Sequence, residues 1–399
     1  MSLLGRQVFY PQYTIQGDTP SMLFQTDRQS FIREFDVASA FADRKSFHDS
    51  VVELKAVEGD GVYLSARGLT SEVCLKSKAD MKGAGLDGKP SRALVRPWLL
   101  KQVLTVAESD TLEIVRPTPE HASIEVSTPG DAWNSLWTLM LPDVNSFKEV
   151  PQFDSTKYFI VKAGELRQAI NDVWFCADRV GSAKYALSTV RMEFRGDALK
   201  LMATDGRMLG LSTLKTIKMA SPADCDFMIP LESVQSLMAA LRNPEANVQL
   251  AVESGRLQCR ADACTIRITE QAGRYPGIEL FEREENYRSA TIVFNIGPFA
   301  RAMSQLVSMT DADESAVCLT KDNGNTIRAQ CGKSFIDIPC DNNVSTVRCH
   351  MDIRRIIQFC KSIRDPEITI EWAPPVNEGS THKFSYGGTR FFIMPMARE

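Results

Sequence analysis

The sequence predicts an α+β protein made of three tandem copies of one domain. Three segments led by Phe24, Phe159 and Phe294 start 135 residues apart, and each reads as a short strand followed by an amphipathic helix. With 399 residues, of which 44% are hydrophobic, every third of the chain can bury a core of its own. Equivalent domains in series favour a repetitive scaffold over a protein with a single catalytic pocket.

The first helix of each copy carries an apolar stripe at helical spacing. The stripe residues are Phe31, Phe35, Ala38 and Ala42 in the first copy, Leu166, Ile170, Val173 and Ala177 in the second, and Phe299, Met303 and Leu306 in the third. The residues off the second stripe are Arg167, Gln168, Asn171 and Asp172. Phe299 follows Phe31 by 268 residues rather than 270, so we expect a shorter strand-to-helix turn in the third copy. An Ala-Asp pair recurs at the same position of each copy, at residues 42–43, 177–178 and 312–313.

Strands and a second helix follow in each copy. In the second copy Val190, Met192 and Phe194 alternate with charged residues, and a Gly196-Asp197 turn leads into another strand. The ranges expected for the second helices are residues 97–107, 230–241 and 351–363. The first two begin with a Pro, which suits a first helical turn. Each domain is therefore expected to hold two helices and about eight strands.

The predicted organisation is an N-terminal extension over residues 1–20 and domains over residues 21–150, 151–285 and 286–399. No apolar run approaches the roughly 18 residues that cross a bilayer. Residues 1–14 include Arg6, Tyr10 and Pro11, where a signal peptide would need an unbroken apolar stretch. The expected location is therefore cytoplasmic.

The 10 cysteines are scattered without a Cys-x-x-Cys pair, which predicts buried reduced thiols rather than disulfides or metal ligands. Only 4 histidines are present, and none has metal-ligand spacing from another His or Cys. Cys349 and His350 are adjacent, but neighbouring residues of a strand point to opposite faces. We expect no metal and no cofactor.

The charge distribution leaves two interpretations open. The chain is net acidic at −4, which by itself argues against nucleic-acid binding. Cations are nevertheless frequent in the predicted helices and just after them: Arg28, Arg33, Arg44, Lys45, Arg96, Lys101, Lys162, Arg167, Arg179, Lys184, Arg242, Arg301, Arg354, Arg355, Lys361 and Arg364. Acidic residues on the same helices, such as Asp36, Asp172 and Asp178, make a solvated helix surface about as good an explanation as a surface that follows DNA phosphates.

Four segments resemble the bacterial DNA polymerase III beta subunit, the replicative sliding clamp family. They are ATDGRMLGL over 203–211, IPLESVQSLM over 229–238, GRYPGIEL over 273–280 and FFIMPMARE over 391–399. The resemblance extends over residues 24–399. It implies three clamp-type domains per chain and a head-to-tail homodimer whose six domains close a DNA-clamp ring around duplex DNA, without reading its sequence. The implied partners are duplex DNA, the replicative DNA polymerase, the clamp loader and other clamp-motif peptides. It implies no catalytic activity.

The resemblance also assigns site residues. Those that match clamp positions near DNA are Arg44, Lys45, Arg179, Lys184 and Tyr185. Those that match the family's partner-peptide pocket, between the second and third domains, are Leu187, Thr204, Gly206, Arg207, Leu209, Pro230, Val234, Tyr275, Met394, Pro395 and Met396. Taken singly, Asp205-Gly206 is a common tight-turn pair, and Leu187 or Val234 would be ordinary core. Two Met side chains suit a pocket with several partners because they repack around different ligands.

Two departures from the family pattern bear on partner preference rather than on the fold. Arg207-Met208 stands where the family usually has His-Arg, so a cation is displaced by one position at the pocket rim. Residues 397–399 read Ala-Arg-Glu, where Arg-Leu is usual.

One motif points to a different function. GAGLDGKP over residues 83–90 matches half of a phosphate-binding loop, but Pro90 replaces the Ser or Thr that would hold magnesium. A Gly-rich loop explains the segment as well, so an ATPase is disfavoured. The sequence thus predicts a non-enzymatic DNA sliding clamp, a processivity factor that tethers the polymerase. The alternative is a divergent clamp-like adaptor that binds peptides without encircling DNA.

Overall fold

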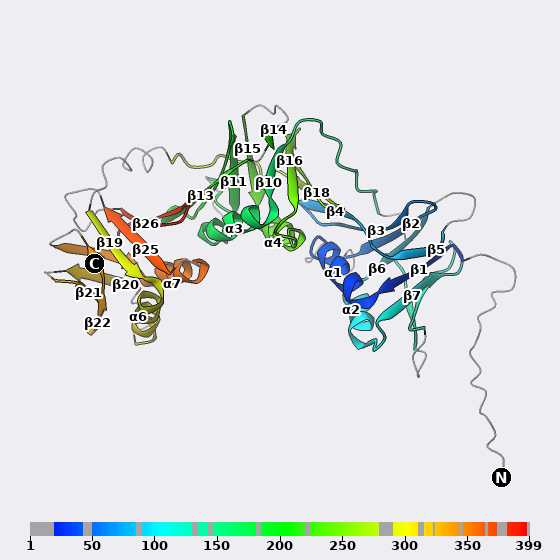
Figure 1. Cartoon of the computed structure of the whole chain (residues 1–399), viewed down its shortest axis with the longest axis horizontal. Helices are drawn as coiled ribbons and strands as arrows, with labels where there is room; N and C mark the ends of the chain where they lie inside the picture. The colour runs from blue at the N-terminus through cyan, green and yellow to red at the C-terminus, as the bar shows by residue number, and fades with distance from the viewer. Residues whose placement is uncertain are drawn as a thin grey trace, which may run out of the picture. The chain divides into compact units, whose positions relative to one another are not determined.

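The computed structural model (Figure 1) describes residues 20–42, 50–84, 90–129, 135–142, 147–180, 185–216, 218–219, 224–278, 290–309, 315–321, 324–342, 346–363, 366–372 and 381–396. The chain divides into two compact units, unit 1 of residues 1–68 and 72–151, and unit 2 of residues 69–71 and 152–399. The predicted N-terminal extension lies outside the described residues except for Pro20. So do Asp43, residues 312–313, most of the Gly-rich segment at 85–89, and the predicted domain boundary at 285/286, which stays a prediction.

The described part of unit 1 holds two helices and nine strands. In chain order they are β1 (Met22–Asp27), α1 (Arg28–Ser39), β2 (Val52–Val57), β3 (Gly61–Arg67), β4 (Ser71–Lys76), β5 (Asp80–Ala84), β6 (Ser91–Val95), α2 (Pro97–Val106), β7 (Thr111–Arg116), β8 (Ser123–Ser127) and β9 (Leu136–Met140). The strands pair antiparallel in the orders β5-β1-β7-β8-β9 and β4-β3-β2-β6.

The core of unit 1 forms where the stripe of α1 meets β1. Phe24, Phe31 and Phe35 are fully buried, and the rings of Phe24 and Phe31 have centroids 5.9 Å apart. Asp27 begins the helix by accepting a hydrogen bond from the Ser30 N–H at 2.7 Å. Glu53 of β2 is also buried and pairs with Arg92 of β6. Burial raises the pKa of Glu53 above its ordinary value, and the nearby Arg92 charge opposes this shift.

Unit 2 begins with two helices and nine strands. They are β10 (Phe159–Lys162), α3 (Ala163–Val173), the 3₁₀ turn η2 (Trp174–Cys176), β11 (Thr189–Arg195), β12 (Ala198–Thr204), β13 (Met208–Lys215), β14 (Lys218–Met219), β15 (Cys225–Pro230), α4 (Leu231–Ala240), β16 (Asn247–Glu253), β17 (Arg256–Ala261) and β18 (Cys264–Thr269).

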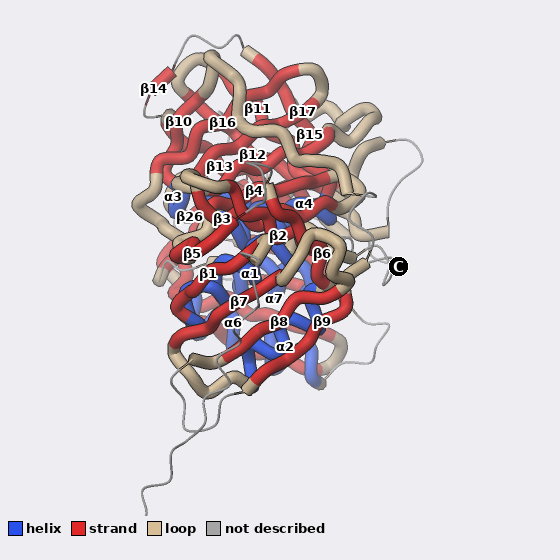
Figure 2. The backbone as a smooth tube through the Cα atoms, turned by 90° about the vertical axis from the view of Figure 1, so that its right-hand side faces the viewer, coloured by secondary structure: helices blue, strands red, loops and turns tan. Residues whose placement is uncertain are grey.

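Unit 2 continues with two more helices and nine more strands. They are β19 (Ala290–Asn295), α6 (Ile296–Ser308), β20 (Ala316–Lys321), β21 (Thr326–Cys331), β22 (Ser334–Pro339), β23 (Asp341–Asn342), β24 (Val347–Asp352), α7 (Ile353–Ser362), β25 (Glu367–Trp372), β26 (His382–Tyr386) and β27 (Thr389–Ile393). Each third of the chain thus has the two predicted helices, and nine described strands rather than about eight. Figure 2 shows how strands dominate this α+β fold.

One sheet of unit 2 joins segments that are far apart in the sequence. Its nine strands follow the order β15-β11-β12-β13-β27-β26-β25-β19-β23. At the centre β13 pairs antiparallel with β27, from Met208 opposite Ile393 to Ser212 opposite Thr389. Strands β14-β10-β16-β17-β18 are neighbours in a different sheet, and β22-β21-β20-β24 form a separate four-stranded sheet. The β13–β27 junction is the part of the fold that positions the site.

The helical stripes of the repeat are confirmed, whereas the strand register of the third copy differs from the one predicted. The stripe residues Phe299, Met303 and Leu306 are buried on α6, as their counterparts are on α1 and α3. The residue that begins the helix lies three positions after Phe24 and Phe159, at Asp27 and Lys162, but directly after Phe294 in the third copy. The prediction of a shorter strand-to-helix turn there is wrong, because the helix follows its strand directly in all three copies. The buried Ile292, three positions before Asn295, occupies the strand position that Phe24 has in the first copy.

Asp172 is buried, whereas the sequence predicts it on a solvated helix surface. It lies off the apolar stripe of α3 but is only 4% exposed, and Thr389 of β27 contacts its carboxylate. One carboxylate oxygen accepts from the Gln168 side-chain amide at 2.6 Å, and the other accepts from the Thr389 hydroxyl at 3.0 Å. Asp172 is thus a buried acceptor between α3 and β27 rather than a solvated charge.

Gly210 of β13 permits the close approach of α3 and η2. A Cβ atom at this position would lie 3.0 Å from the Cys176 sulfur and 3.2 Å from the Val173 Cα. Beside it the rings of Phe175 and Phe391 stack with centroids 5.5 Å apart. The helix therefore packs directly on the strands that carry the site.

All 10 cysteines are free thiols, and most of them are buried, as predicted. Burial raises the pKa of Cys259 to about 12, so this thiol stays protonated at neutral pH. None of the described helices is long and apolar enough to span a membrane.

Candidate functional site

A pocket of about 130 Å³ opens at the β13–β27 junction of unit 2. Its wall comes from the turn between β12 and β13, from the chain after β18, and from β27 with the residue that follows it. The lining residues are Thr204, Gly206, Arg207, Met208, Leu209, Pro276, Gly277, Ile278, Phe392 and Met394. The wall is mainly apolar, with an exposed guanidinium from Arg207 at the rim.

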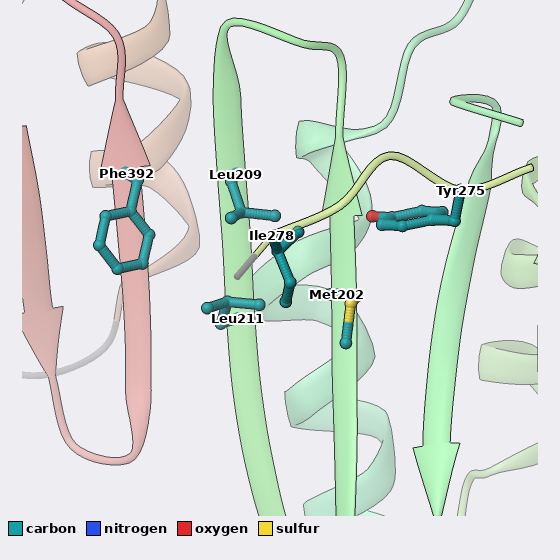
Figure 3. Close-up of a cluster of buried hydrophobic side chains, with 6 residues drawn as sticks. All are labelled: Met202, Leu209, Leu211, Tyr275, Ile278 and Phe392. Atoms are coloured by element: carbon teal, nitrogen blue, oxygen red, sulfur yellow. The ribbon is translucent and has the colours of Figure 1, made fainter. Parts of the chain in front are cut away.

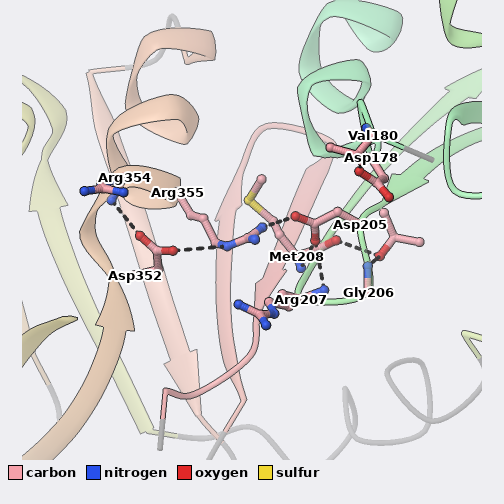
Figure 4. Close-up of polar contacts among 10 residues, drawn as sticks. Asp178, Val180, Asp205, Gly206, Arg207, Met208, Asp352, Arg354 and Arg355 are labelled. Carbon is pink, nitrogen blue, oxygen red and sulfur yellow. Dashed lines mark hydrogen bonds and ion pairs between the residues drawn. The ribbon is translucent and has the colours of Figure 1, made fainter. Parts of the chain in front are cut away.

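The turn over residues 204–208 is held by its own side chains (Figure 4). One oxygen of Asp205 accepts from the backbone N–H groups of Arg207 and Met208, both at 2.8 Å. The Thr204 hydroxyl donates to the Met208 carbonyl at 2.7 Å and accepts from the Gly206 N–H at 3.0 Å. Gly206 has φ of +85°, a conformation that favours glycine. The Asp-Gly pair is thus a tight turn, and the turn forms part of the pocket wall.

A backbone hydrogen bond connects this turn to Met394 on the opposite wall of the pocket, and an ion pair connects it to α7. The Met394 N–H donates to the Arg207 carbonyl at 2.9 Å, and the Met396 N–H donates to the His350 carbonyl at 3.1 Å. The second oxygen of Asp205 forms an ion pair with Arg355 of α7. Arg355 also approaches Asp352, with its Nε 3.4 Å from the carboxylate.

A buried apolar cluster supports the pocket from below (Figure 3). Its members are Met202, Leu209, Leu211, Tyr275, Ile278 and Phe392. The Tyr275 hydroxyl is buried without a hydrogen-bond partner among the described residues, and burial raises the pKa of Tyr275 well above its ordinary value. The Arg191 guanidinium lies 5.3 Å from the centre of the Tyr275 ring. Because Leu209, Ile278 and Phe392 belong to both cluster and wall, the floor of the pocket is continuous with the core.

Five residues assigned by the resemblance lie in the pocket wall: Thr204, Gly206, Arg207, Leu209 and Met394. Six lie outside the lining: Leu187, Pro230, Val234, Tyr275, Pro395 and Met396. Val234 is fully buried on α4, and Tyr275 belongs to the supporting cluster. Pro395 and Met396 are half-buried beyond Met394.

The lining also contains five residues that the sequence reasoning did not assign: Met208, Pro276, Gly277, Ile278 and Phe392. All five lie within the segments GRYPGIEL and FFIMPMARE or directly after Arg207. The resemblance therefore identified the segments that form the pocket wall, but it did not identify which of their side chains line the pocket.

Of the residues assigned to DNA contact, the structure describes Arg179 and Tyr185, while Arg44, Lys45 and Lys184 lie outside the described residues. Arg179 is exposed, and its guanidinium lies 5.6 Å from the centre of the Trp174 ring. Tyr185 is half-buried. Close to these two residues in the sequence, the Asp178 N–H donates a hydrogen bond to the Leu187 carbonyl at 3.1 Å.

Not every helix cation is available to a ligand. Lys101 forms an ion pair with Asp36 at 2.7 Å, and Arg355 lies between Asp205 and Asp352. Others are exposed on the helices or at their ends, among them Arg33, Arg167, Arg242, Arg301, Arg354 and Lys361. Part of the helix charge is therefore neutralised within the fold, and a surface of cations that follows DNA phosphates stays a prediction.

Solved structures share this fold along nearly the whole chain. The Pseudomonas aeruginosa sliding clamp, DNA polymerase III subunit beta, solved with griselimycin bound, is 16% identical with a TM-score of 0.81, covering 95% of this chain and 100% of that one. The Thermotoga maritima DNA polymerase III beta subunit is 15% identical with a TM-score of 0.80, at 95% and 100% coverage. The Bacillus subtilis DNA polymerase sliding clamp is 13% identical with a TM-score of 0.79, also at 95% and 100% coverage. No curated protein matches the sequence.

The fold is therefore that of the sliding clamps. Residues 160–277 match the family described as DNA polymerase III beta subunit, central domain. The family match is confined to this segment, and over the rest of the chain the similarity is one of fold.

Proposed function

We propose that this chain is a DNA sliding clamp, a non-enzymatic processivity factor. It would act in the cytoplasm as a homodimeric ring around duplex DNA, and would tether the replicative polymerase, the clamp loader and other partners through short peptides. The observation that carries the proposal is the apolar pocket at the β13–β27 junction, in a chain with the fold of the DNA polymerase III beta subunits.

The pocket supports binding of one apolar side chain of a partner peptide. Its volume of about 130 Å³ is close to the roughly 150 Å³ of a cavity that holds benzene. Ile278 and Phe392 offer an apolar floor, while Met394 at the rim is 40% exposed and can adjust to different ligands. A peptide with a Leu-Phe-type end could place one ring or isobutyl group in the pocket and lay the next on the rim.

Unpaired strand edges support the homodimer. Among the described strands, β9 ends one sheet of unit 1 and β22 ends one sheet of unit 2. Both carry exposed apolar side chains: Leu136 and Met140 on β9, and Phe335 on β22. An exposed apolar edge is a template for pairing with another chain. Head-to-tail pairing of two copies would cover both kinds of edge and close a ring.

The exposed helix cations support weak, sequence-independent contact with phosphates. Arg167 and Arg179 are exposed on or beside α3, and the resemblance adds Arg44, Lys45 and Lys184 to this role. A ring that holds DNA topologically needs no tight contact. A net charge of −4 then limits nonspecific binding on its other surfaces.

The test measures the mass and the topology of binding. Light scattering at micromolar concentration should give twice the mass of the chain, 44.5 kDa. Protein loaded on a closed circular duplex by a clamp loader from the same source should stay bound during gel filtration, and should be lost after one restriction cut. The variant Arg179→Glu with Lys184→Glu should load less well while unfolding at an unchanged temperature.

Retention that is indifferent to linearisation would contradict the encircling model. A monomer that binds peptides but is not retained on circles would favour the adaptor that does not encircle DNA.

A further inference from the structure

The guanidinium of Arg355 lies between two carboxylates at the side of the pocket (Figure 4). It forms an ion pair with Asp205 from the β12–β13 turn, and its Nε lies 3.4 Å from Asp352 at the start of its own helix. The three side chains are 19%, 20% and 21% exposed, so the group is largely shielded from water. Such pairs are screened by salt less than exposed pairs are.

Asp205 connects this ion group to the pocket wall. The oxygen that does not meet Arg355 accepts the N–H groups of Arg207 and Met208, and these bonds fix the turn. The turn supplies the lining from Gly206 to Leu209. Neither Asp205 nor Arg355 belongs to the described lining, so a ligand in the pocket would not contact them directly.

Asp352 holds the Arg355 side chain from the α7 side. It begins α7 by accepting from the Arg354 N–H at 2.9 Å, and its second oxygen faces Arg355. The Arg355 side chain thus has a defined origin on a helix and a defined target 150 positions away in the sequence. A planar guanidinium that meets two carboxylates is held in one geometry, which the single ammonium of a Lys would not reproduce.

We infer that Arg355 is a positioning residue that holds the turn over residues 204–208 in its binding shape before a peptide arrives. The inference rests on the proposed function of the pocket as a peptide site. Without this ion pair the turn samples other positions relative to Met394, and only part of the population can bind. If the competent fraction falls to between about one in five and one in twenty, the apparent affinity falls by the same factor.

The test uses a fluorescein-labelled peptide with a Gln and a Leu-Phe end, and follows binding to the full chain by stopped-flow anisotropy. In Arg355→Ala the association rate constant should fall about 5- to 20-fold, while the dissociation rate constant changes less than about twofold, because the filled pocket keeps its contacts. Arg355→Lys should recover part of the association rate. Arg354→Ala, at the exposed neighbour, is the matched control and should bind like the unmodified chain.

A second measurement does not depend on a ligand. Hydrogen exchange at the amides of Arg207 and Met208 should speed up in Arg355→Ala and in Asp205→Asn, and the double variant should exchange no faster than either single one. If Arg355→Ala does not fold by its thermal transition, Arg355→Lys and Asp205→Asn carry the same comparison.

The outcomes separate the inference from the proposed function. Unchanged association in Arg355→Ala with normal peptide binding by the unmodified chain would overturn the positioning role alone. Faster dissociation at an unchanged association rate would also overturn it, because the residue would then stabilise the bound complex. No peptide binding by the unmodified chain would overturn both.

Discussion

Met394 is the apolar residue of the pocket wall whose contribution to binding can best be separated from folding. Its side chain is 40% exposed, whereas Leu209 and Phe392 are 2% and 1% exposed and belong to the core. Its backbone N–H bond to the Arg207 carbonyl does not depend on the side chain. The substitution Met394→Ala therefore removes contact area from a peptide and leaves the sheet intact.

The size of the effect follows from the exposed fraction. Full burial of a Met side chain stabilises by about 1.5–3 kcal/mol. A peptide can cover at most the 40% that is exposed, which corresponds to about 0.6–1.2 kcal/mol of binding free energy. The Kd of the complex should therefore rise about 3- to 8-fold in Met394→Ala. Met394→Leu keeps a similar apolar area and should stay within about twofold of the unmodified chain.

The assay is an equilibrium anisotropy titration with the labelled peptide, at one salt concentration for all variants. Thermal unfolding of each variant checks that the fold is unchanged. An equal Kd for the unmodified chain and Met394→Ala would refute the reasoning, since the peptide would then not cover this side chain. Equal weakening by Ala and Leu would refute it as well, because the effect would not follow apolar area.

Two further predictions concern packing and pH. Gly210→Ala should destabilise unit 2 by about 1–3 kcal/mol, because the new methyl group meets α3 and η2. Gly388→Ala, where an added Cβ stays 3.6 Å from the nearest atom, should shift the urea midpoint little, and equal midpoints for the two variants would contradict this packing argument. Burial raises the pKa of Glu53, so its contribution to stability is complete below the unfolded-state pKa and is lost as the pH rises through the folded pKa. Glu53→Gln should flatten the pH dependence of the unfolding midpoint of unit 1 in that window, and an unaltered slope would count against the shift.

Local patterns predicted the regular elements well because each pattern reflects a local cause. Pro97 sets the first turn of α2, and Gly196 takes a positive φ in the turn between β11 and β12, as the sequence suggested. In these cases the residues that determine the structure are neighbours in the sequence.

Contacts between distant segments could not be predicted in this way. The helical period places Asp172 toward solvent, but the residue that buries and satisfies it, Thr389, lies 217 positions away. Arg355 reads as one more surface cation until Asp205 is brought to it. Likewise, the wall of the pocket combines Ile278 with Phe392, and no local spacing relates the two.

The pairing of β13 with β27 has a consequence for folding during synthesis on the ribosome. Ser212 and Thr389 face each other across this junction with a separation of 177 positions. At a synthesis rate of about 5–20 residues per second, β27 leaves the ribosome about 10–35 s after β13. Throughout that interval β13, which contains Leu209 and Leu211, has one strand edge without its partner and can pair with a wrong strand. We therefore expect the nascent chain to be a client of a holding chaperone during this interval, and slow codons between positions 212 and 389 to prolong its dependence.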